Sequence, residues 1–466
     1  MLSALFREYL EGKKVVILGF GREGQSTYRH IRKWLPDMPL IICDKNPAVE
    51  KPSLPGDDPA LVRWWLGSDY LWGLIDAGVI IKTPGIPFYQ MLDYVPKEAV
   101  VTSQTELFLR FFKHQVIGIT GTKGKSTTAS LLKHIFDVAG IHALLAGNIG
   151  APCFDFIEKM ERDTIMVFEM SSHQLEEISY SPHIAVLLNI FEEHLDHYDS
   201  FSDYQQAKIN IVRWQEPGDY CIYNADNAIV SNLVGELNLP SDKVSLGILD
   251  AGATGIYCDG EDMVYVDGRS EKLLSGLCTK RLLPGDHNLI NISAAAGAAI
   301  ISGVSDNAVQ EAVASFRGLP HRLEYIGTFR GVHYYNDSIS TIPEAAMEAV
   351  KSFPSTTTLI VGGKDRGVDY TALMAFLAGS SLQTLILIGG AGRRMLEMRH
   401  DFPALKDKKL HWTDSFDGAV AKAVRETPAG GICLLSPAAA SYDMFSNFEE
   451  RGQRFREMVQ KYATKS

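Results

Sequence analysis

The chain has 466 residues, 46% of them hydrophobic, with a formal net charge of −11, an isoelectric point near 5.7 and a mean hydropathy of −0.02. This length exceeds what one hydrophobic core supports and predicts about three domains. The acidic charge argues against a nucleic-acid surface, which needs clustered Lys and Arg. The start carries Arg7 and Glu8 among its apolar residues, unlike a signal peptide, and no apolar run reaches the ~20 residues of a membrane helix. We therefore expect a cytoplasmic protein without membrane insertion.

Cysteine usage supports the same compartment. The chain contains no C-x-x-C pair, and its six cysteines are scattered: Cys43, Cys153, Cys221, Cys258, Cys278 and Cys433. In a large chain without an export signal this pattern indicates reduced core thiols, and neither a disulfide framework nor a zinc site.

Short apolar runs alternate with helical patterns, which predicts an α/β fold built from parallel units. The expected strands lie at 14–19, 39–43, 78–83, 115–120, 164–170, 183–190, 332–337, 356–363, 384–390 and 431–437. Residues 245–283 differ, because Gly, Asp and short β-like pieces there predict small hairpins. We place three domains at 1–112, 113–318 and 319–466.

The first domain opens with a glycine-rich loop between a strand and a helix. Gly19, Gly21 and Gly24 form G-x-G-x-x-G, and Asp44 ends the next strand 20 residues later. This spacing is typical of a Rossmann-like dinucleotide loop, in which the backbone approaches a pyrophosphate at a helix N-terminus. A tight turn without a ligand is the alternative, and the motif alone does not distinguish NAD from another nucleotide diphosphate.

A second loop, Gly121-Thr122-Lys123-Gly124-Lys125-Ser126, joins the strand "QVIGIT" to a helix that we expect to begin at Gly124 or Lys125. The common P-loop fingerprint needs a glycine at position 119, where this chain has Ile119. Backbone amides, the Lys125 cation and the Ser126 hydroxyl nevertheless suit a triphosphate with Mg²⁺. We therefore predict ATP binding here.

Charged residues follow two further strands. Glu169 ends an apolar strand, where a Mg²⁺ shared with Ser126 would compensate its charge; a solvated strand end is the alternative. A cluster of charged residues and histidines follows the strand at 183–190: Glu192, Glu193, His194, Asp196 and His197. Its position at the carboxyl end of a strand predicts a functional site. Lys208 lies in an amphipathic helix, and physical reasoning alone predicts a solvated lysine.

Together these segments resemble the ATP-dependent Mur ligases of peptidoglycan synthesis, and most of all their glutamate-adding members. The matching pieces span nearly the whole chain: "GTKGKST", "GNIG", "EMSSHQLE", "LNIFEEHLDHY", "AKINI", "PGDHNLINISAA", "GLPHRLE", "NDS", "GGKDRG" and "LSPAAASYDMFSNFEERGQRF". The family loop is G-T-x-G-K-[ST], so Ile119 is expected of it. The resemblance implies a UDP-substrate-binding first domain, a central P-loop-type ATPase domain and a Rossmann-like third domain that closes over the nucleotide and glutamate.

The resemblance also implies residue roles. ATP with Mg²⁺ is bound by Gly121, Thr122, Lys123, Gly124, Lys125, Ser126, Thr127, Asn288, Asn291, Arg322 and Asp337. The metal ligands are Ser126, Glu169, His194 and a carbamylated Lys208, and the catalytic residues are Lys125, His194 and Lys208. The substrates, UDP-N-acetylmuramoyl-L-alanine and glutamate, contact Arg22, Glu23, Asp44, Thr83, Asn148, Ser171, Gln174, Lys364, Arg366, Ser441 and Phe448. We expect the enzyme to act as a monomer.

One position departs from the family pattern. Many glutamate-adding members carry a lysine after "NDS" that helps to bind nucleotide phosphate, whereas this chain has Ile339. The substitution leaves L-glutamate open as the acceptor beside D-glutamate. Two other functions remain as alternatives: an NAD-dependent dehydrogenase built on the first glycine loop, and a nucleotide-binding regulator without catalysis.

Overall fold

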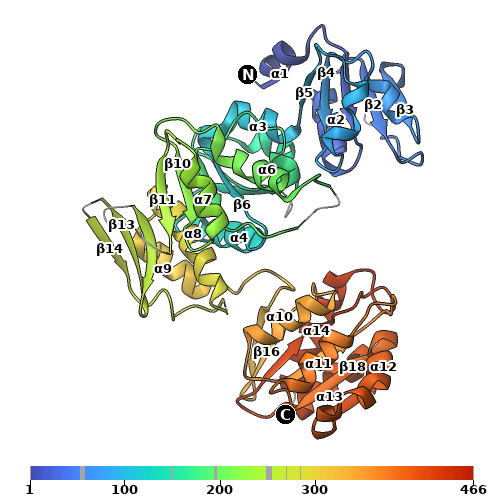
Figure 1. Ribbon diagram of the computed structural model, residues 1–466, viewed down its shortest axis with the longest axis vertical. Coiled ribbons are helices and arrows are strands. Elements are labelled where there is room, and N and C mark those ends of the chain that lie inside the picture. The colour runs from blue at the N-terminus through green and yellow to red at the C-terminus, as the bar shows by residue number, and fades with distance from the viewer. Residues whose placement is uncertain are drawn as a thin grey trace. The chain divides into compact units, whose positions relative to one another are not determined.

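The computed structural model describes residues 2–52, 58–147, 151–193, 197–247, 254–268, 270–283 and 285–464. Three separate sheets organise these residues, and the sheet order follows the chain (Figure 1). The chain divides into two compact units, Met1–Lys280 with Leu289–Val313 and Arg281–Asn288 with Ala314–Ser466. Every helix in the described ranges is too short or too polar to cross a bilayer.

The first sheet is parallel throughout, in the order β3-β2-β1-β4-β5. Its strands are β1 Val15–Leu18, β2 Leu40–Asp44, β3 Val62–Leu66, β4 Val79–Lys82 and β5 Val100–Thr102. The helices beside it are α1 Leu2–Leu10, α2 Arg22–Trp34 and α3 Gln104–Phe112. The order reverses at β1, and in such sheets ligands bind at the carboxyl ends beside the reversal. The glycine loop that follows β1 occupies this place.

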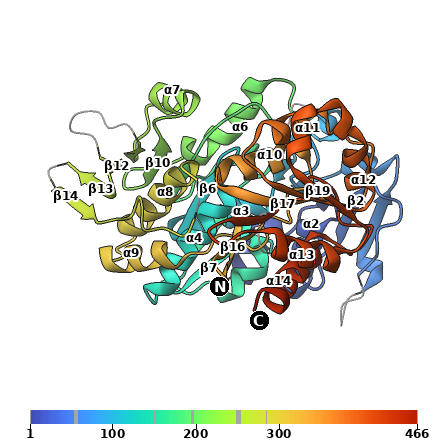
Figure 2. The same cartoon turned by 90° about the horizontal axis from the view of Figure 1, so that it is seen from below.

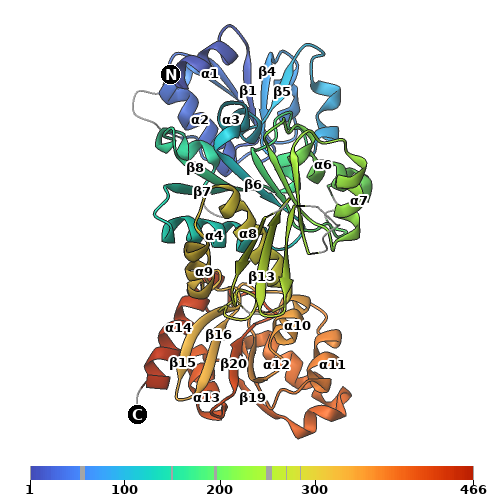
Figure 3. The same ribbon diagram turned by 90° about the vertical axis from the view of Figure 1, so that its left-hand side faces the viewer.

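The central sheet has the order β14-β13-β12-β11-β10-β9-β6-β8-β7. Its strands are β6 Val116–Thr120, β7 Ala143–Gly147, β8 Ile165–Glu169, β9 Ile184–Leu187, β10 Tyr220–Asn224, β11 Asp242–Leu246, β12 Gly255–Asp259, β13 Asp262–Asp267 and β14 Ser270–Leu274. Its helices are α4 Lys125–Val138, α5 Ser172–Leu175, α6 Phe201–Arg213, α7 Ala228–Glu236, α8 His287–Ile301 and α9 Asp306–Ser315. Helices α6 and α7 cover one face, and α4, α8 and α9 cover the other (Figures 2 and 3).

The hairpins expected at 245–283 are confirmed, because β12, β13 and β14 pair antiparallel and extend the sheet. The expectation that all cysteines are reduced is wrong for one pair. Cys258 on β12 and Cys278 after β14 form a disulfide, with their Cα atoms 6.4 Å apart. The antiparallel pairing brings together residues 20 positions apart, and the scattered spacing gave no sign of it. The other four cysteines are buried and free.

The third sheet has the order β15-β16-β20-β17-β18-β19, with only β15 antiparallel to its neighbour. Its strands are β15 Glu324–Phe329, β16 Val332–Asn336, β17 Thr356–Gly362, β18 Thr384–Ile388, β19 Lys409–Thr413 and β20 Ile432–Leu435. Its helices are α10 Pro343–Ser352, α11 Thr371–Gly379, α12 Gly389–Met398, α13 Phe416–Glu426 and α14 Phe448–Thr464. Alternate residues of the strands pack on α10–α12 and on α13–α14. Burial on both faces explains the unbroken apolar runs in the sequence.

Candidate active site

The loop of residues 121–126, called the phosphate loop from here on, lies at the carboxyl end of β6, as the sequence predicts. Helix α4 begins at Lys125, directly after Gly124, whose φ of +88° is the left-handed conformation that favours glycine. A Cβ on Gly124 would lie 2.3 Å from Oδ1 of Asn291, which is buried on α8. Asn291, expected in the adenine site, therefore packs directly against the loop. Thr127 is buried in the first turn of α4, where Ser126 is half-buried.

Two lysines converge on one carbonyl of this loop. The Lys125 Nζ donates to the carbonyl oxygens of Gly121 at 2.8 Å and Thr122 at 3.1 Å. The Lys208 Nζ donates to the same Gly121 oxygen at 2.9 Å. The expectation of a solvated Lys208 from helix pattern alone is wrong, because its side chain is only 1% exposed. Burial lowers the pKa of Lys208 well below its usual value, and nearby Lys125 lowers it further.

The buried Glu169 lies beside the phosphate loop. It ends β8, which pairs with β6 so that Glu169 stands opposite Ile119, two residues before Gly121. The carboxylate is 2% exposed, which contradicts the solvated strand-end interpretation. A buried carboxylate and the Ser126 hydroxyl are oxygen ligands of the kind that Mg²⁺ prefers. The donor set therefore fits a magnesium ion, although His194, the third expected ligand, lies outside the described residues.

The segment that follows β9 makes hydrogen bonds and an ion pair with the phosphate loop. The Lys123 amide donates to Oδ1 of Asn189 at 2.8 Å, and the Lys123 ammonium pairs with Glu193 at 2.8 Å. The Thr122 hydroxyl lies 2.9 Å from that of Tyr204 on α6. Sequence reasoning missed Asn189 and Tyr204, although "LLN" at the end of an apolar strand was a usable signal.

The glycine loop of the first domain closes on Thr83 and Asp44. A Cβ on Gly19, which has φ +90°, would overlap the Thr83 hydroxyl, so these two expected residues touch. The Asp44 carboxylate accepts from the Phe20 amide at 2.6 Å and from the Asn46 amide at 2.7 Å. Asp44 thus holds the loop, and it also lines a cavity of this unit. Arg22 is exposed at the start of α2.

Glu23 and Gln174, two expected substrate residues, contact each other. The Gln174 Nε2 donates to Oε1 of Glu23 at 2.8 Å, and Gln174 also completes a capping box with Ser171 at the start of α5. Burial raises the pKa of Glu23 to about 6, although the bond from Gln174 and the charge of Lys82 act in the opposite direction. These contacts join the first domain to the central one within the same compact unit.

Lys82 makes a second such link, which the sequence reasoning missed. Its ammonium is 4% exposed and donates to the Ile86 carbonyl at 2.8 Å and to Glu176 at 3.3 Å. The signal was available, since a lysine that ends the apolar strand "VIIK" needs a partner.

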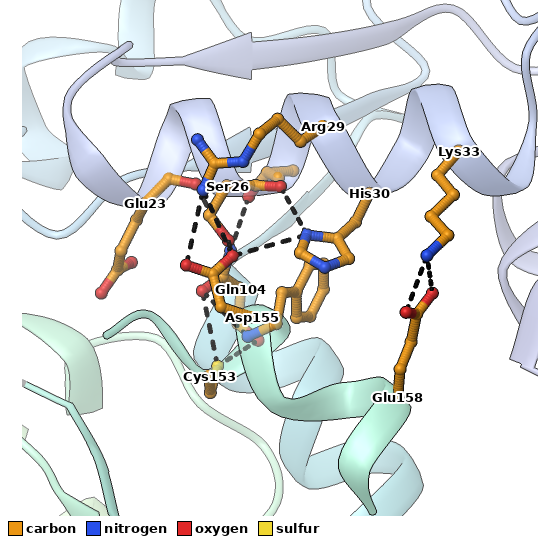
Figure 4. Close-up of polar contacts among 11 residues, drawn as sticks. Glu23, Ser26, Arg29, His30, Lys33, Gln104, Cys153, Asp155 and Glu158 are labelled. Carbon is orange, nitrogen blue, oxygen red and sulfur yellow. Dashed lines mark hydrogen bonds and ion pairs between the residues drawn. The ribbon is translucent and has the colours of Figure 1, made fainter. Parts of the chain in front are cut away.

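A third link joins α2 to the 3₁₀ helix Cys153–Lys159, as Figure 4 shows. Asp155 accepts from the Ser26 hydroxyl at 2.6 Å and pairs with Arg29 at 3.3 Å. Lys33 pairs with Glu158 one helical turn further along α2. Helix α2 is therefore fixed on the central domain along three turns, and the glycine loop at its start is fixed with it.

A cavity of about 860 Å³ extends across this unit between the two loops. The first-domain residues that line it include Gly19, Gly21, Asp44 and Thr83, and the central-domain residues include Lys125, Ser171, His173, His197, Tyr204 and Lys208. One continuous space therefore reaches from the glycine loop of the first domain to Lys125 at the start of α4 and Lys208 on α6.

The other compact unit carries the remaining expected residues. The loop after β16 buries Asp337, whose carboxylate accepts from Ser340 at 2.6 Å, Ser436 at 2.7 Å and the Leu323 amide at 3.2 Å. Burial raises the pKa of Asp337 to about 6 against these three donors. Asp337 thus ties together the loops that follow β16 and β20.

Arg451 on α14 joins the same two loops. Its buried guanidinium donates to the Ser338 hydroxyl at 2.9 Å, to the Ser338 carbonyl at 2.8 Å and to the Ala439 carbonyl at 3.0 Å. Ser441 is buried two residues beyond Ala439, and the Phe448 carbonyl accepts from Ser338 at 2.8 Å. Arg322, Lys364 and Arg366 are exposed, whereas Asn288 is buried. Asn148 lies outside the described residues.

Solved structures share this fold at low sequence identity. The UDP-N-acetylmuramate-alanine ligase of Thermotoga maritima superposes with a TM-score of 0.53 at 15% identity, covering 96% of this chain and 99% of that one. MurF of Acinetobacter baumannii gives a TM-score of 0.56 at 16% identity, covering 96% and 92%. This chain therefore has the three-domain α/β fold of these ligases.

Sequence relationships are stronger. Residues 119–299 match the family model of the Mur ligase middle domain. The UDP-N-acetylmuramoylalanine–D-glutamate ligase of Geotalea uraniireducens is 35% identical over 97% of this chain and 98% of its own. The protein of the same name from Desulfitobacterium hafniense is 34% identical over 97% and 98%. The chain belongs to the Mur ligase family, which confirms the resemblance found in its motifs.

Proposed function

We propose that this enzyme joins D-glutamate to UDP-N-acetylmuramoyl-L-alanine in peptidoglycan precursor synthesis, converting ATP to ADP and phosphate. Relatives that match nearly the full chain carry the name of this reaction. The structural support is the cavity of about 860 Å³ that connects the glycine loop with Lys125 and Lys208. A UDP group held at the first loop would extend its peptide carboxylate toward a triphosphate held at the second.

The reaction needs two bond changes. An oxygen of the alanine carboxylate attacks the γ-phosphorus of ATP, forming an acyl phosphate as ADP leaves. The amine of glutamate then attacks the acyl carbon, the phosphate leaves with the bonding electron pair, and the amine gives up a proton. Because the acyl phosphate is already activated, this protein contributes mainly position and electrostatic stabilisation.

The phosphate loop supplies most of that stabilisation. Its backbone amides and the start of α4 face the phosphate oxygens, and Lys125 exchanges its two loop carbonyls for phosphate oxygens. Ser126 and Glu169 would hold Mg²⁺, which neutralises charge that develops on the transferred phosphoryl group. Asn291 fixes the loop conformation through its packing on Gly124.

The first domain orients the other substrate. Arg22, Thr83 and the amides after Gly19 are proposed to bind the uracil and diphosphate. Gln174 and Ser171 are proposed to face the muramoyl group from α5. In the other unit, Lys364 or Arg366 with Ser441 and Phe448 are proposed to receive glutamate, and Arg322 with Asp337 are proposed to bind nucleotide. We propose that the reaction takes place in the cytoplasm.

A phosphate-release assay tests this function. The enzyme is supplied with ATP, Mg²⁺ and UDP-N-acetylmuramoyl-L-alanine, with D-glutamate and L-glutamate offered separately. We expect release that depends on D-glutamate and falls by roughly 100-fold or more in Lys125→Ala, because a cation facing the transferred group is lost. Lys133→Ala, on the same helix and paired with Asp137, is the matched control. Full activity of Lys125→Ala would reject the assignment of this loop to ATP binding. Phosphate release that occurs only with L-glutamate would reject D-glutamate as the acceptor.

A further inference from the structure

Two histidines and an aspartate meet at the amino-terminal ends of three central strands, the opposite ends from the phosphate loop. His114, His183 and Asp219 each come shortly before one of the neighbouring strands β6, β9 and β10. The backbone fixes their spacing, since the His183 amide donates to the Lys113 carbonyl at 2.9 Å and the Tyr220 amide donates to the His183 carbonyl at 2.8 Å. The three side chains therefore occupy a site that rigid strands position.

Asp219 selects the tautomer of His183. Its buried carboxylate lies 2.8 Å from Nδ1 of His183 and accepts from the Glu216 amide at 2.8 Å through its other oxygen. A carboxylate can only accept, so Nδ1 carries the proton and Nε2 of neutral His183 carries a lone pair. A carboxylate that orients a histidine in this way is the usual outer partner of a metal-ligating imidazole.

His114 brings a second imidazole to the same place. The potential ligand atoms of His114, His183 and Asp219 all lie within 4.8 Å of one another, and the two imidazole centroids are 6.4 Å apart. Neighbouring ligands around tetrahedral zinc are separated by about 3.4 Å, given bonds near 2.1 Å. The His114 side chain is exposed, so rotation about its side-chain bonds can close this difference.

The nearby charges are compatible with a cation. Lys113, the closest ammonium in sequence, is paired with Glu216 at 2.6 Å. Glu216 is also the residue whose amide donates to Asp219, and its carboxylate pairs with Lys113, so this ion pair lies at the same ends of the strands. The ion pair offsets the positive charge that would otherwise repel a metal.

We propose that His114 and His183, with Asp219 orienting His183, form a binding site for a divalent transition metal of the zinc type, separate from the Mg²⁺ ligands of the phosphate loop. Imidazole nitrogens suit Zn²⁺, whereas Mg²⁺ prefers an all-oxygen set. Bound metal would connect the segments that precede three strands of the central sheet, which stabilises the folded state by mass action. An ordinary hydrogen-bonded His183–Asp219 pair, with His114 nearby by chance, is the competing interpretation.

Equilibrium dialysis of the full chain against Zn²⁺ alone, followed by elemental analysis, distinguishes the two. We expect wild type to retain one equivalent more than His114→Ala at the same free Zn²⁺ concentration, whatever the phosphate loop binds in both. His400→Ala removes an exposed histidine elsewhere and should retain the wild-type number. Because His114 is exposed, its variant should fold and keep its Mg²⁺-supported ligase activity.

Asp219→Asn provides a second measurement. It removes the charge that orients His183, and loss of a carboxylate that hydrogen-bonds a metal-ligating histidine weakens metal affinity by roughly 10- to 100-fold. Zn²⁺ should also raise the melting temperature of wild type more than that of His114→Ala. Equal metal content in wild type and His114→Ala, with equal melting shifts, would overturn the proposal.

Discussion

Replacing Glu23 with glutamine tests whether the contact between α2 and α5 holds a carboxylate at an energetic cost. One oxygen of Glu23 accepts from Gln174, while Oε2 is buried without a hydrogen-bond partner among the described residues. Burial raises the pKa of Glu23 from 4.5 to about 6. This difference of about 1.5 units corresponds to roughly 2 kcal/mol, since each unit is about 1.4 kcal/mol.

The direction in which the free energy of unfolding changes with pH follows from proton binding. Below pH 4.5 Glu23 is neutral in both folded and unfolded chains, so its ionisation costs nothing. Between pH 4.5 and about 6 the folded state binds more protons, and the free energy of unfolding falls as pH rises. Above pH 6 the full cost of about 2 kcal/mol remains. Glu23→Gln keeps the acceptor for Gln174 and removes the charge, so the variant should gain about 1–2 kcal/mol at pH 8 and almost nothing near pH 4.5.

Thermal unfolding at pH 5 and pH 8 measures this difference. The melting temperature of Glu23→Gln should exceed that of wild type by a few degrees at pH 8, with a smaller excess at pH 5, given ~2–4 °C per kcal/mol in domains of this size. The exposed Glu161→Gln is the control and should shift neither value. A variant that is less stable than wild type by the same amount at both pH values would refute the reasoning, because the carboxylate would then be stabilised by its surroundings.

The remaining predictions concern the phosphate loop and the other unit. Gly124→Ala should reduce ATP affinity at least 10-fold in a calorimetric titration, since its Cβ would meet Asn291 at 2.3 Å and its φ of +88° disfavours alanine, and unchanged affinity would contradict this. Lys208 has the lowered pKa that its reaction with CO₂ requires, so enzyme dialysed free of CO₂ should lose activity and regain it with bicarbonate, whereas indifference to bicarbonate would reject carbamylation. Arg451→Lys loses part of a three-bond fork that a single ammonium cannot reproduce, so the KM for glutamate should rise several-fold while the KM for ATP changes little. Equal rises in both KM values would mean that Arg451 only supports the fold.

The sequence predicted most of the fold because the signals were local. The strand "VIGIT", Gly124 and the helix start at Lys125 depend on apolar runs and on one backbone conformation. The phosphate loop was found for the same reason. Contacts between distant segments were harder to predict, and the burial of Lys208 is an example: its helix pattern indicates solvent, and only the packing of α6 on the loop encloses it.

The pairing of Cys258 with Cys278 was also hard to predict from the sequence, because it depends on strand register. The links from Lys82 to Glu176 and from Glu23 to Gln174 depend on how two domains pack within one unit. No periodicity in either segment encodes such a partner. The roles of Asn148 and His194, which lie outside the described residues, stay predictions from the family motif.

The shared acceptor at Gly121 has a consequence for how the enzyme is prepared for turnover. A single oxygen accepts from both lysines, so Lys125 and Lys208 compete for it, and the charge of Lys125 disfavours a charge on Lys208. Conversion of Lys208 to a carbamate would reverse that repulsion into attraction and release the oxygen to Lys125. Nucleotide arrival and lysine modification would then be thermodynamically linked, so that each event changes the affinity for the other by the same factor.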